Sequence, residues 1–191
     1  MLAARERGVP VTVHRIGRIG PDSTTGACRT DDFFWLQIKS FLQLGVAPDD
    51  LHRPVDLLPV DLVADAVVRL ARSPEAQNRT MHIFHPSGMG WETVFAALES
   101  IGRRPRPVPA REWLAALEAA PVGTDGSSLA SLVPLFREGV MELGDHRYVN
   151  ERTVRLLTSL GLDVPAADQA WITSMIRYFA ETGQVAGTPV P

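Results

Sequence analysis

The first half of this chain alternates between strand-like and helix-like segments, and this alternation constrains its fold more than any other feature. Residues 9–16 alternate apolar and polar side chains, as a half-buried strand does. The expected order is a strand at residues 9–16, a helix at 31–45, a short buried strand and then a helix within 55–74, and a strand at 79–86. Strands that alternate with helices in this way predict a parallel α/β sheet over residues 9–85.

Two of the predicted helices have recognisable ends. In the helix at residues 31–45, Asp31 and Asp32 favour the start and Gly45 the end, and its apolar side chains at Phe34, Ile38 and Phe41 have helical spacing. The next helix is expected to begin near Asp61, with this residue as its N-cap, and to end before Pro74. Both helices would pack an apolar face on the sheet.

The pattern changes at residues 86–91, "PSGMGW", after which the sequence is mostly helical. Helices are expected at Trp91–Ile101, Arg111–Ala119, Leu129–Leu143, Asn150–Leu160 and Asp168–Thr182, with Pro134 bending or breaking the third. The change predicts two domains, residues 1–88 with a partial sheet and residues 89–191 as a helical lobe.

Composition excludes several classes of protein. Hydrophobic residues make up 45% and charged residues 21% of the 191 residues, which is typical of a globular chain. The formal net charge of −3 gives no electrostatic reason to expect a nucleic-acid partner. No apolar run approaches the roughly 20 residues needed to cross a membrane, and Cys28 is the only cysteine. We expect a cytoplasmic protein with no membrane contact.

Catalytic and metal-binding motifs are scarce. Gly17, Gly20 and Gly26 punctuate a stretch typical of a ligand-facing loop, but their spacing does not make the GxGxxG of a dinucleotide site. Tyr148 and Arg152 form YxxxR, in which the arginine stays protonated and cannot act as a tunable lysine would. The residues themselves therefore indicate no catalytic group and no metal site.

The order of three segments carries a family resemblance. "ARERGVPVTVHRIGRIGPDSTTGACRTDDFF", then "VDLLPVDLVADAVVRLA", then "MHIFHP" resembles the second half of the terminal thioester reductase domains of nonribosomal peptide and polyketide synthases. These domains are extended short-chain dehydrogenases/reductases, akin to the reductase domains of carboxylic acid reductases. The resemblance covers residues 1 to about 101 well and the rest more loosely. The family has a proline where this chain has Ile16.

The resemblance implies a fold and a function. The fold would be the C-terminal part of a Rossmann-type parallel sheet followed by a mostly helical substrate-binding lobe. Intact relatives use NADPH to release a carrier-bound acyl or peptidyl thioester as an aldehyde or alcohol, with a catalytic tyrosine and lysine that would precede Met1. By resemblance, Arg15, Gly17, Ile19 and Gly20 would line the cofactor side. The lobe, with Trp91 and Trp113, would bind the acyl chain and meet the phosphopantetheine arm of a carrier protein.

Three hypotheses follow from these observations. The first is a fragment of a thioester reductase that lacks the YxxxK and the glycine-rich cofactor motif and is inactive alone. The second is a fragment of another extended short-chain reductase or epimerase. The third is a noncatalytic carrier- or acyl-binding module. A partial parallel sheet exposes strand edges, so we also expect a missing N-terminal half or self-association to cover them.

Overall fold

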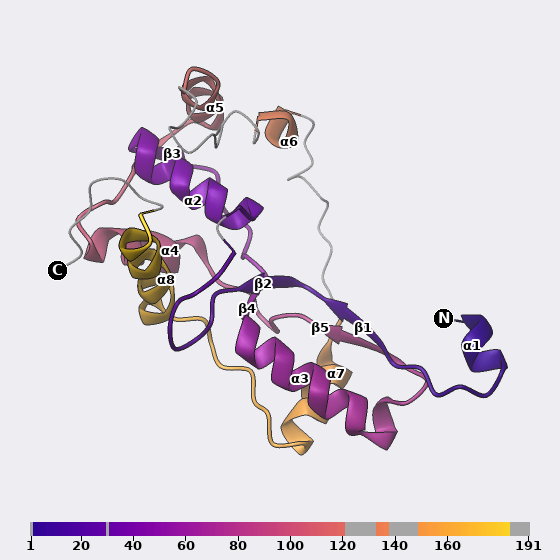
Figure 1. Ribbon diagram of the computed structural model, residues 1–191. Helices are drawn as coiled ribbons and strands as arrows, with labels where there is room; N and C mark the ends of the chain where they lie inside the picture. Colours follow the sequence, from indigo (N-terminus) through magenta and orange to yellow (C-terminus); the bar gives the residue numbers. More distant parts are fainter. Residues whose placement is uncertain (1, 30, 121–132, 138–148, 184–191) are drawn as a thin grey trace.

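The strands of the chain form three parallel pairs. A computed structural model describes residues 2–29, 31–120, 133–137 and 149–183 (Figure 1). The pairs are β1 (Val13–Ile16) with β5 (Thr80–Ile83), β2 (Arg18–Gly20) with β4 (Leu57–Pro59), and β3 (Val46–Pro48) with β6 (Arg106–Val108). Because all three pairs are parallel and separated by helices, the predicted α/β class is confirmed.

One extended segment, residues 13–20, changes its pairing partner at Gly17. Up to Ile16 it pairs with β5, and from Arg18 it pairs with β4. The stretch that the sequence presents as a glycine loop is therefore largely strand β2. The predicted strand at residues 9–16 is also shorter than expected, because only its last four residues find a partner in β5.

Helix α2 (Phe33–Leu44) has the ends that its sequence predicts. The side chain of Asp32 accepts a hydrogen bond from the backbone N–H of Trp35 at 2.9 Å, as an N-cap does. Gly45 ends the helix in the left-handed conformation, with φ of 66°, and donates its backbone N–H to Phe41 O. These two caps explain why α2 spans the predicted range.

Helix α3 (Val60–Arg72) corrects one prediction. Its N-cap is Pro59, and Asp61 lies in its first turn. The carboxylate of Asp61 accepts hydrogen bonds from Ser23, at 3.0 Å from the backbone N and 2.6 Å from the hydroxyl. Asp61 thus ties the segment after β2 to α3, and the prediction that it caps its own helix is wrong. The helix ends before Pro74, as predicted.

The remaining helices follow the predicted order within the described residues. They are α1 (Leu2–Glu6), the short 3-10 helix η1 (Pro74–Ala76), α4 (Trp91–Ser100), α5 (Ala110–Glu118), α6 (Val133–Arg137), α7 (Glu151–Ser159) and α8 (Gln169–Glu181). Asp168 is the N-cap of α8. Of the helix predicted at residues 129–143, all but α6 lies outside the described residues, as does Tyr148.

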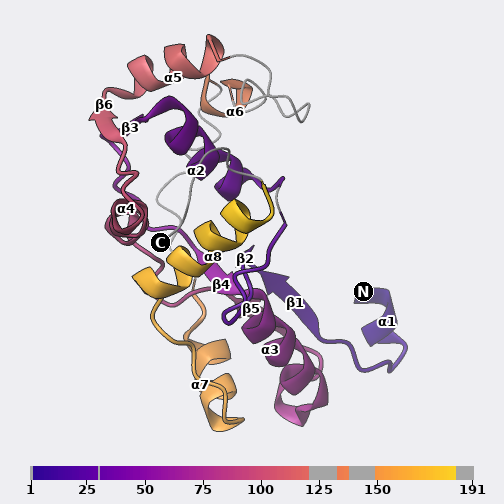
Figure 2. The same ribbon diagram turned by 60° about the vertical axis from the view of Figure 1, so that its left-hand side comes forward.

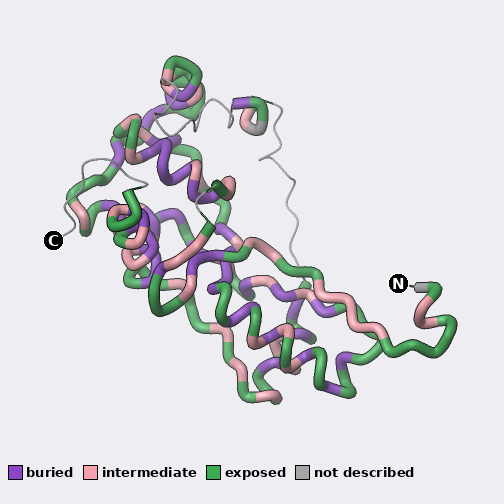
Figure 3. The backbone as a smooth tube through the Cα atoms, viewed as in Figure 1, coloured by how far each residue is buried: buried purple, intermediate pink, exposed green. Residues whose placement is uncertain are grey.

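The buried side chains form two hydrophobic cores. The larger core joins α2, α4, α5 and α8, with α4 and α8 side by side in both ribbon views (Figures 1 and 2). The smaller core joins α3, β5 and α7. Figure 3 shows buried positions along α2 and α8, whereas α1 stands apart. Each core draws on residues before and after 88, so the proposed boundary between residues 1–88 and 89–191 stays a prediction.

Candidate functional site

A cavity of about 760 Å³ lies where β1 and β5 end. We call it the large cavity. Ile16 and Gly17 at the end of β1 and Phe84 just after β5 form one side of it. Trp91 of α4 and Trp113 of α5 form another. In parallel α/β sheets, ligands bind beyond the carboxyl ends of the strands, so this position favours a binding site.

Asp56 lies between the strand ends in this cavity. Its carboxylate accepts a hydrogen bond from the backbone N–H of His85 at 2.7 Å. Burial raises the pKa of Asp56, and the effect exceeds the opposing influence of the hydrogen bond from His85 and of the nearby Arg18 charge. A half-buried carboxyl with a raised pKa is a feature of many functional sites.

Arg18 brings a positive charge into the same cavity. Its guanidinium carbon lies 5.7 Å from the ring centroid of Phe33 and 5.8 Å from that of Phe34, within range of cation–π contact. Burial lowers the pKa of Arg18, and the charges of Asp32 and Asp56 oppose this effect. The arginine stays protonated, because its pKa starts far above neutral pH.

The structure brings some of the predicted site residues together and separates others. Gly17, Trp91 and Trp113 all line the large cavity. Arg15 and Ile19 are exposed, and Ile19 keeps 42% of its surface open. Gly20 is buried, and a Cβ there would lie 2.8 Å from both Leu57 Cγ and Trp171 Cζ2. Packing within the chain accounts for Gly20, and contact of any of these residues with a cofactor or substrate stays a prediction.

Both tryptophans assigned to substrate binding are also part of the larger core. Trp91 is 7% and Trp113 is 1% exposed. Trp113 makes an edge contact with Phe136, with ring centroids 4.6 Å apart, and both tryptophans contact Phe41. They form a rigid aromatic wall, which suits an apolar ligand.

Two residues of the large cavity escaped the sequence-based site assignment. Asp56 directly precedes the buried strand β4, and a carboxylate beside such a strand is a usable signal. Gln37 is fully buried and lies three residues after Phe34 and four before Phe41, on the buried face of α2. A polar residue at an apolar position of a helix was therefore visible in the sequence.

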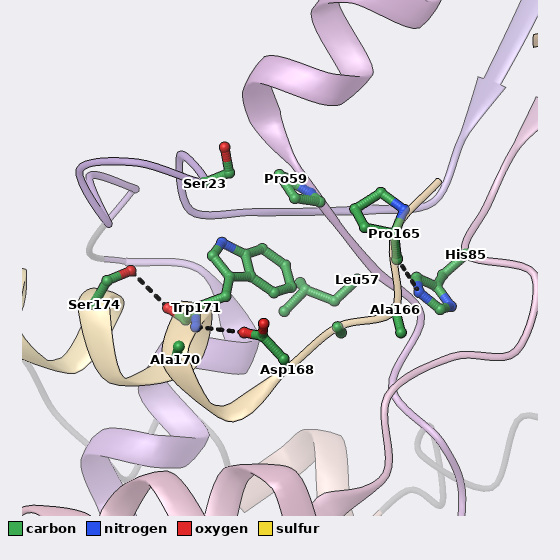
Figure 4. Close-up of a pocket in the computed structure, with 11 residues that line it drawn as sticks. Ser23, Leu57, Pro59, His85, Pro165, Ala166, Asp168, Ala170, Trp171 and Ser174 are labelled. Carbon is green, nitrogen blue, oxygen red and sulfur yellow. Dashed lines mark hydrogen bonds between the residues drawn. The ribbon is translucent and has the colours of Figure 1, made fainter. Parts of the chain in front are cut away.

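A second cavity, of about 290 Å³, lies between β4 and the start of α8 (Figure 4). Its polar side chains already have partners. Trp171 donates its indole N–H to Pro21 O at 3.2 Å, and the Ser23 hydroxyl donates to Asp61. A ring nitrogen of His85 lies 3.2 Å from Pro165 O. Because these groups are engaged, the large cavity is the stronger candidate for ligand binding.

Metal and membrane sites receive no support from the part of the chain that is described. In those residues, no three His, Cys, Asp or Glu side chains gather closely enough to hold a metal ion. No described helix has both the length and the apolar character needed to cross a membrane.

Comparisons with known proteins identify relatives that contain this site. Residues 1–67 match the family model described as Male sterility protein, an NAD-binding family. The chain is 34% identical over 187 residues to a linear gramicidin synthase of Brevibacillus parabrevis, a match that covers 97% of the chain and 4% of that synthase. The sequence relationship therefore extends along nearly the whole chain.

Solved structures extend this relationship to the fold. The terminal R domain from the myxalamid PKS-NRPS biosynthetic pathway matches with a TM-score of 0.82 and 30% identity, over 97% of this chain and 47% of that domain. A thiolation-reductase di-domain from an archaeal non-ribosomal peptide synthetase shares the fold, with a TM-score of 0.78 and 22% identity over 96% of this chain and 38% of that protein. The chain spans about half or less of the proteins that it matches. It belongs to the family of terminal reductase domains of nonribosomal peptide and polyketide synthases, which have the extended short-chain dehydrogenase/reductase fold.

Proposed function

We propose that this chain is the acyl-binding part of an NADPH-dependent thioester reductase, which releases a carrier-bound acyl or peptidyl thioester as an aldehyde or alcohol. The observation that carries the proposal is the large cavity, which opens at the carboxyl ends of β1 and β5 and has a wall of aromatic side chains. A cavity of about 760 Å³ is large enough for a drug-sized ligand.

The residues of this chain do not form a nucleotide site by themselves. The space beside Gly17 is filled by Asp56 and Phe84, and the space beside Gly20 is filled by Leu57 and Trp171. Neither glycine leaves a cradle in which a pyrophosphate could lie. We therefore derive no chemical step through NADPH from these residues. NADPH would bind to the part of the reductase domain that the half-length matches leave out.

A carrier protein is the proposed source of the substrate. The archaeal relative is a thiolation-reductase di-domain, which supports a carrier partner in this family. In the present chain, His52, Arg53 and Arg111 are exposed and line the large cavity. Basic groups at the exposed side of an apolar cavity suit a thioester whose arm carries a phosphodiester.

The role of the chain's own residues is binding and the exclusion of water. Trp91 and Trp113 would pack on the acyl chain, and Arg18 would stay charged at the strand ends near the thioester. Asp56 holds the turn after β5 through His85, which keeps the two strand ends together. None of these residues forms the tyrosine and lysine pair of the family, so we expect no turnover by the chain alone.

The test combines binding with activity. The purified chain is titrated with an acyl-pantetheine thioester by calorimetry, and nicotinamide absorbance is followed when NADPH and the same thioester are added. Binding without NADPH oxidation is expected. Rapid NADPH oxidation by the chain alone would contradict its assignment as an incomplete reductase, and absence of thioester binding would contradict the whole proposal.

The DNA sequence upstream of the Met1 codon separates the remaining alternatives. A reductase fragment predicts an open frame that encodes a glycine-rich cofactor motif and YxxxK. A stop codon close upstream would instead favour the noncatalytic acyl-binding module. The two outcomes assign the same cavity to different biological roles.

A further inference from the structure

Two buried side chains in the wall of the large cavity have polar atoms without hydrogen-bond partners. Gln37 is 0% exposed, and neither its Oε1 nor its Nε2 has a partner in the described structure. Trp113 is 1% exposed, and its indole Nε1 is also unpartnered there. Both residues line the large cavity.

Unpartnered polar groups at such positions call for an explanation. Roughly 90% or more of buried polar groups in proteins have a hydrogen-bond partner, because an unmet one keeps its full desolvation cost. The Gln37 amide offers both a donor and an acceptor, and the Trp113 indole N–H is a donor only. Helix α2 places Gln37 between Phe34 and Phe41 on its buried face, so bulk water does not reach the amide.

Trp35 shows that one orphaned group is not sufficient. Its indole Nε1 is also buried and unpartnered, but Trp35 stacks on Phe179 at 3.4 Å between ring centroids and does not line the large cavity. The signal at Gln37 and Trp113 is different, because two unsatisfied side chains from separate helices line one cavity. A shared ligand explains both residues.

We propose that Gln37 and Trp113 recognise an amide group of the ligand that fills the large cavity. A secondary amide supplies a carbonyl for the indole N–H and the glutamine NH₂, and an N–H for the glutamine oxygen. On binding, the Gln37 side chain turns its amide toward the ligand. The inference rests on the proposed function, since it assumes that the cavity holds a thioester. The amide belongs either to the pantetheine arm or to the acyl chain.

A site with buried polar groups discriminates strongly against a ligand that cannot pair with them. The experiment therefore titrates the full chain with three thioesters by calorimetry. The first is an alkanoyl thioester of ethanethiol, which has no amide. The second is an alkanoyl thioester of pantetheine, with amides only in the arm. The third is an N-acetylaminoacyl thioester of ethanethiol, with an amide only in the acyl part.

The variants are Gln37→Met and Trp113→Phe, with Trp35→Phe as the matched control. We expect at least one amide-bearing thioester to bind about tenfold or more tightly than the amide-free one. Gln37→Met and Trp113→Phe should remove that preference, and Trp35→Phe should keep it. Which thioester shows the preference identifies the arm or the acyl chain as the source.

Thermal unfolding of the ligand-free variants gives a second measurement. Because Gln37 makes no hydrogen bond among the described residues, Gln37→Met should leave the Tm unchanged or raise it. A lowered Tm with equal losses of affinity for all three thioesters would mean a structural role and overturn the inference. Equal binding of all three by the unmodified chain would also overturn it, with the proposed function intact. Binding of none would overturn both.

Discussion

Gly17 lies directly against the carboxylate of Asp56, at the point where the extended segment leaves β5 and joins β4. A Cβ at Gly17 would overlap Asp56 Oδ2 and lie 2.6 Å from Phe84 Cδ1. This contact brings the ends of β1 and β5 and the start of β4 together beside the large cavity. The close approach of Asp56 is the reason that this position takes glycine.

Substitution of Gly17 by alanine should destabilise the protein. Overpacking of this kind costs on the order of 1–3 kcal/mol, and the free energy of unfolding can be measured in urea. Gly90→Ala is the control, because no atom lies within 4 Å of a Cβ added there. The double variant Gly17→Ala/Asp56→Ala should recover part of the loss. An effect of Gly17→Ala no larger than that of Gly90→Ala would contradict the packing argument.

The raised pKa of Asp56 predicts that its charge destabilises the fold at neutral pH. An acid whose folded pKa lies above its unfolded value contributes stability at low pH, and that contribution is lost as the pH rises through the folded pKa. Asp56→Asn keeps an oxygen that accepts the hydrogen bond from His85. We expect the variant to be more stable than the unmodified chain at pH 7, with an advantage that shrinks as the pH falls toward that of an ordinary carboxyl.

Urea unfolding of both proteins across this pH range checks the Asp56 prediction. A difference in unfolding free energy that is independent of pH, or that grows in acid, would contradict it.

Cys28 should be unreactive in the folded protein. Burial, with a further effect of the Asp32 charge, raises the pKa of its thiol to about 12. The thiolate is the reactive species, so alkylation by iodoacetamide at pH 8 should be at least ~100-fold slower than for a free cysteine, whose pKa is about 8.5. The same reaction in denaturant is the control, and fast labelling of the folded chain would contradict the assignment.

The free edge of β1 should promote self-association of the chain. Among the described strands, β1 pairs only with β5, and Val9, Ile16 and Ile19 are exposed apolar residues along the same segment. Charged side chains on edge strands oppose such pairing. Sedimentation velocity should therefore show association that increases with protein concentration and that Ile19→Lys reduces. Val68→Lys changes an exposed apolar residue on α3 and serves as the control.

A monomer at every concentration tested would contradict the self-association prediction. An equal effect of Ile19→Lys and Val68→Lys would show that general charge, and not the strand edge, controls association.

The elements that the sequence predicts best are those whose signals are local. Helix α2 is the clearest case, because Asp32, the apolar series and Gly45 all act within one helix. Its hydrogen bonds join residues four apart, so the chain needs no distant partner to define it. The alternation of strands and helices likewise indicated a parallel sheet, since parallel strands need long connections.

Tertiary structure decided the features that depend on distant partners. Residues 18–20 become strand β2 because Leu57–Pro59 lies beside them, nearly forty positions along the chain. Asp61 leaves its capping role because Ser23 offers two donors. Gln37 and Trp113 come to one cavity only when α2 and α5 pack together. Strand pairing, side-chain bonds and cavities are contacts between remote residues, so local propensity determines the helices while packing determines the site.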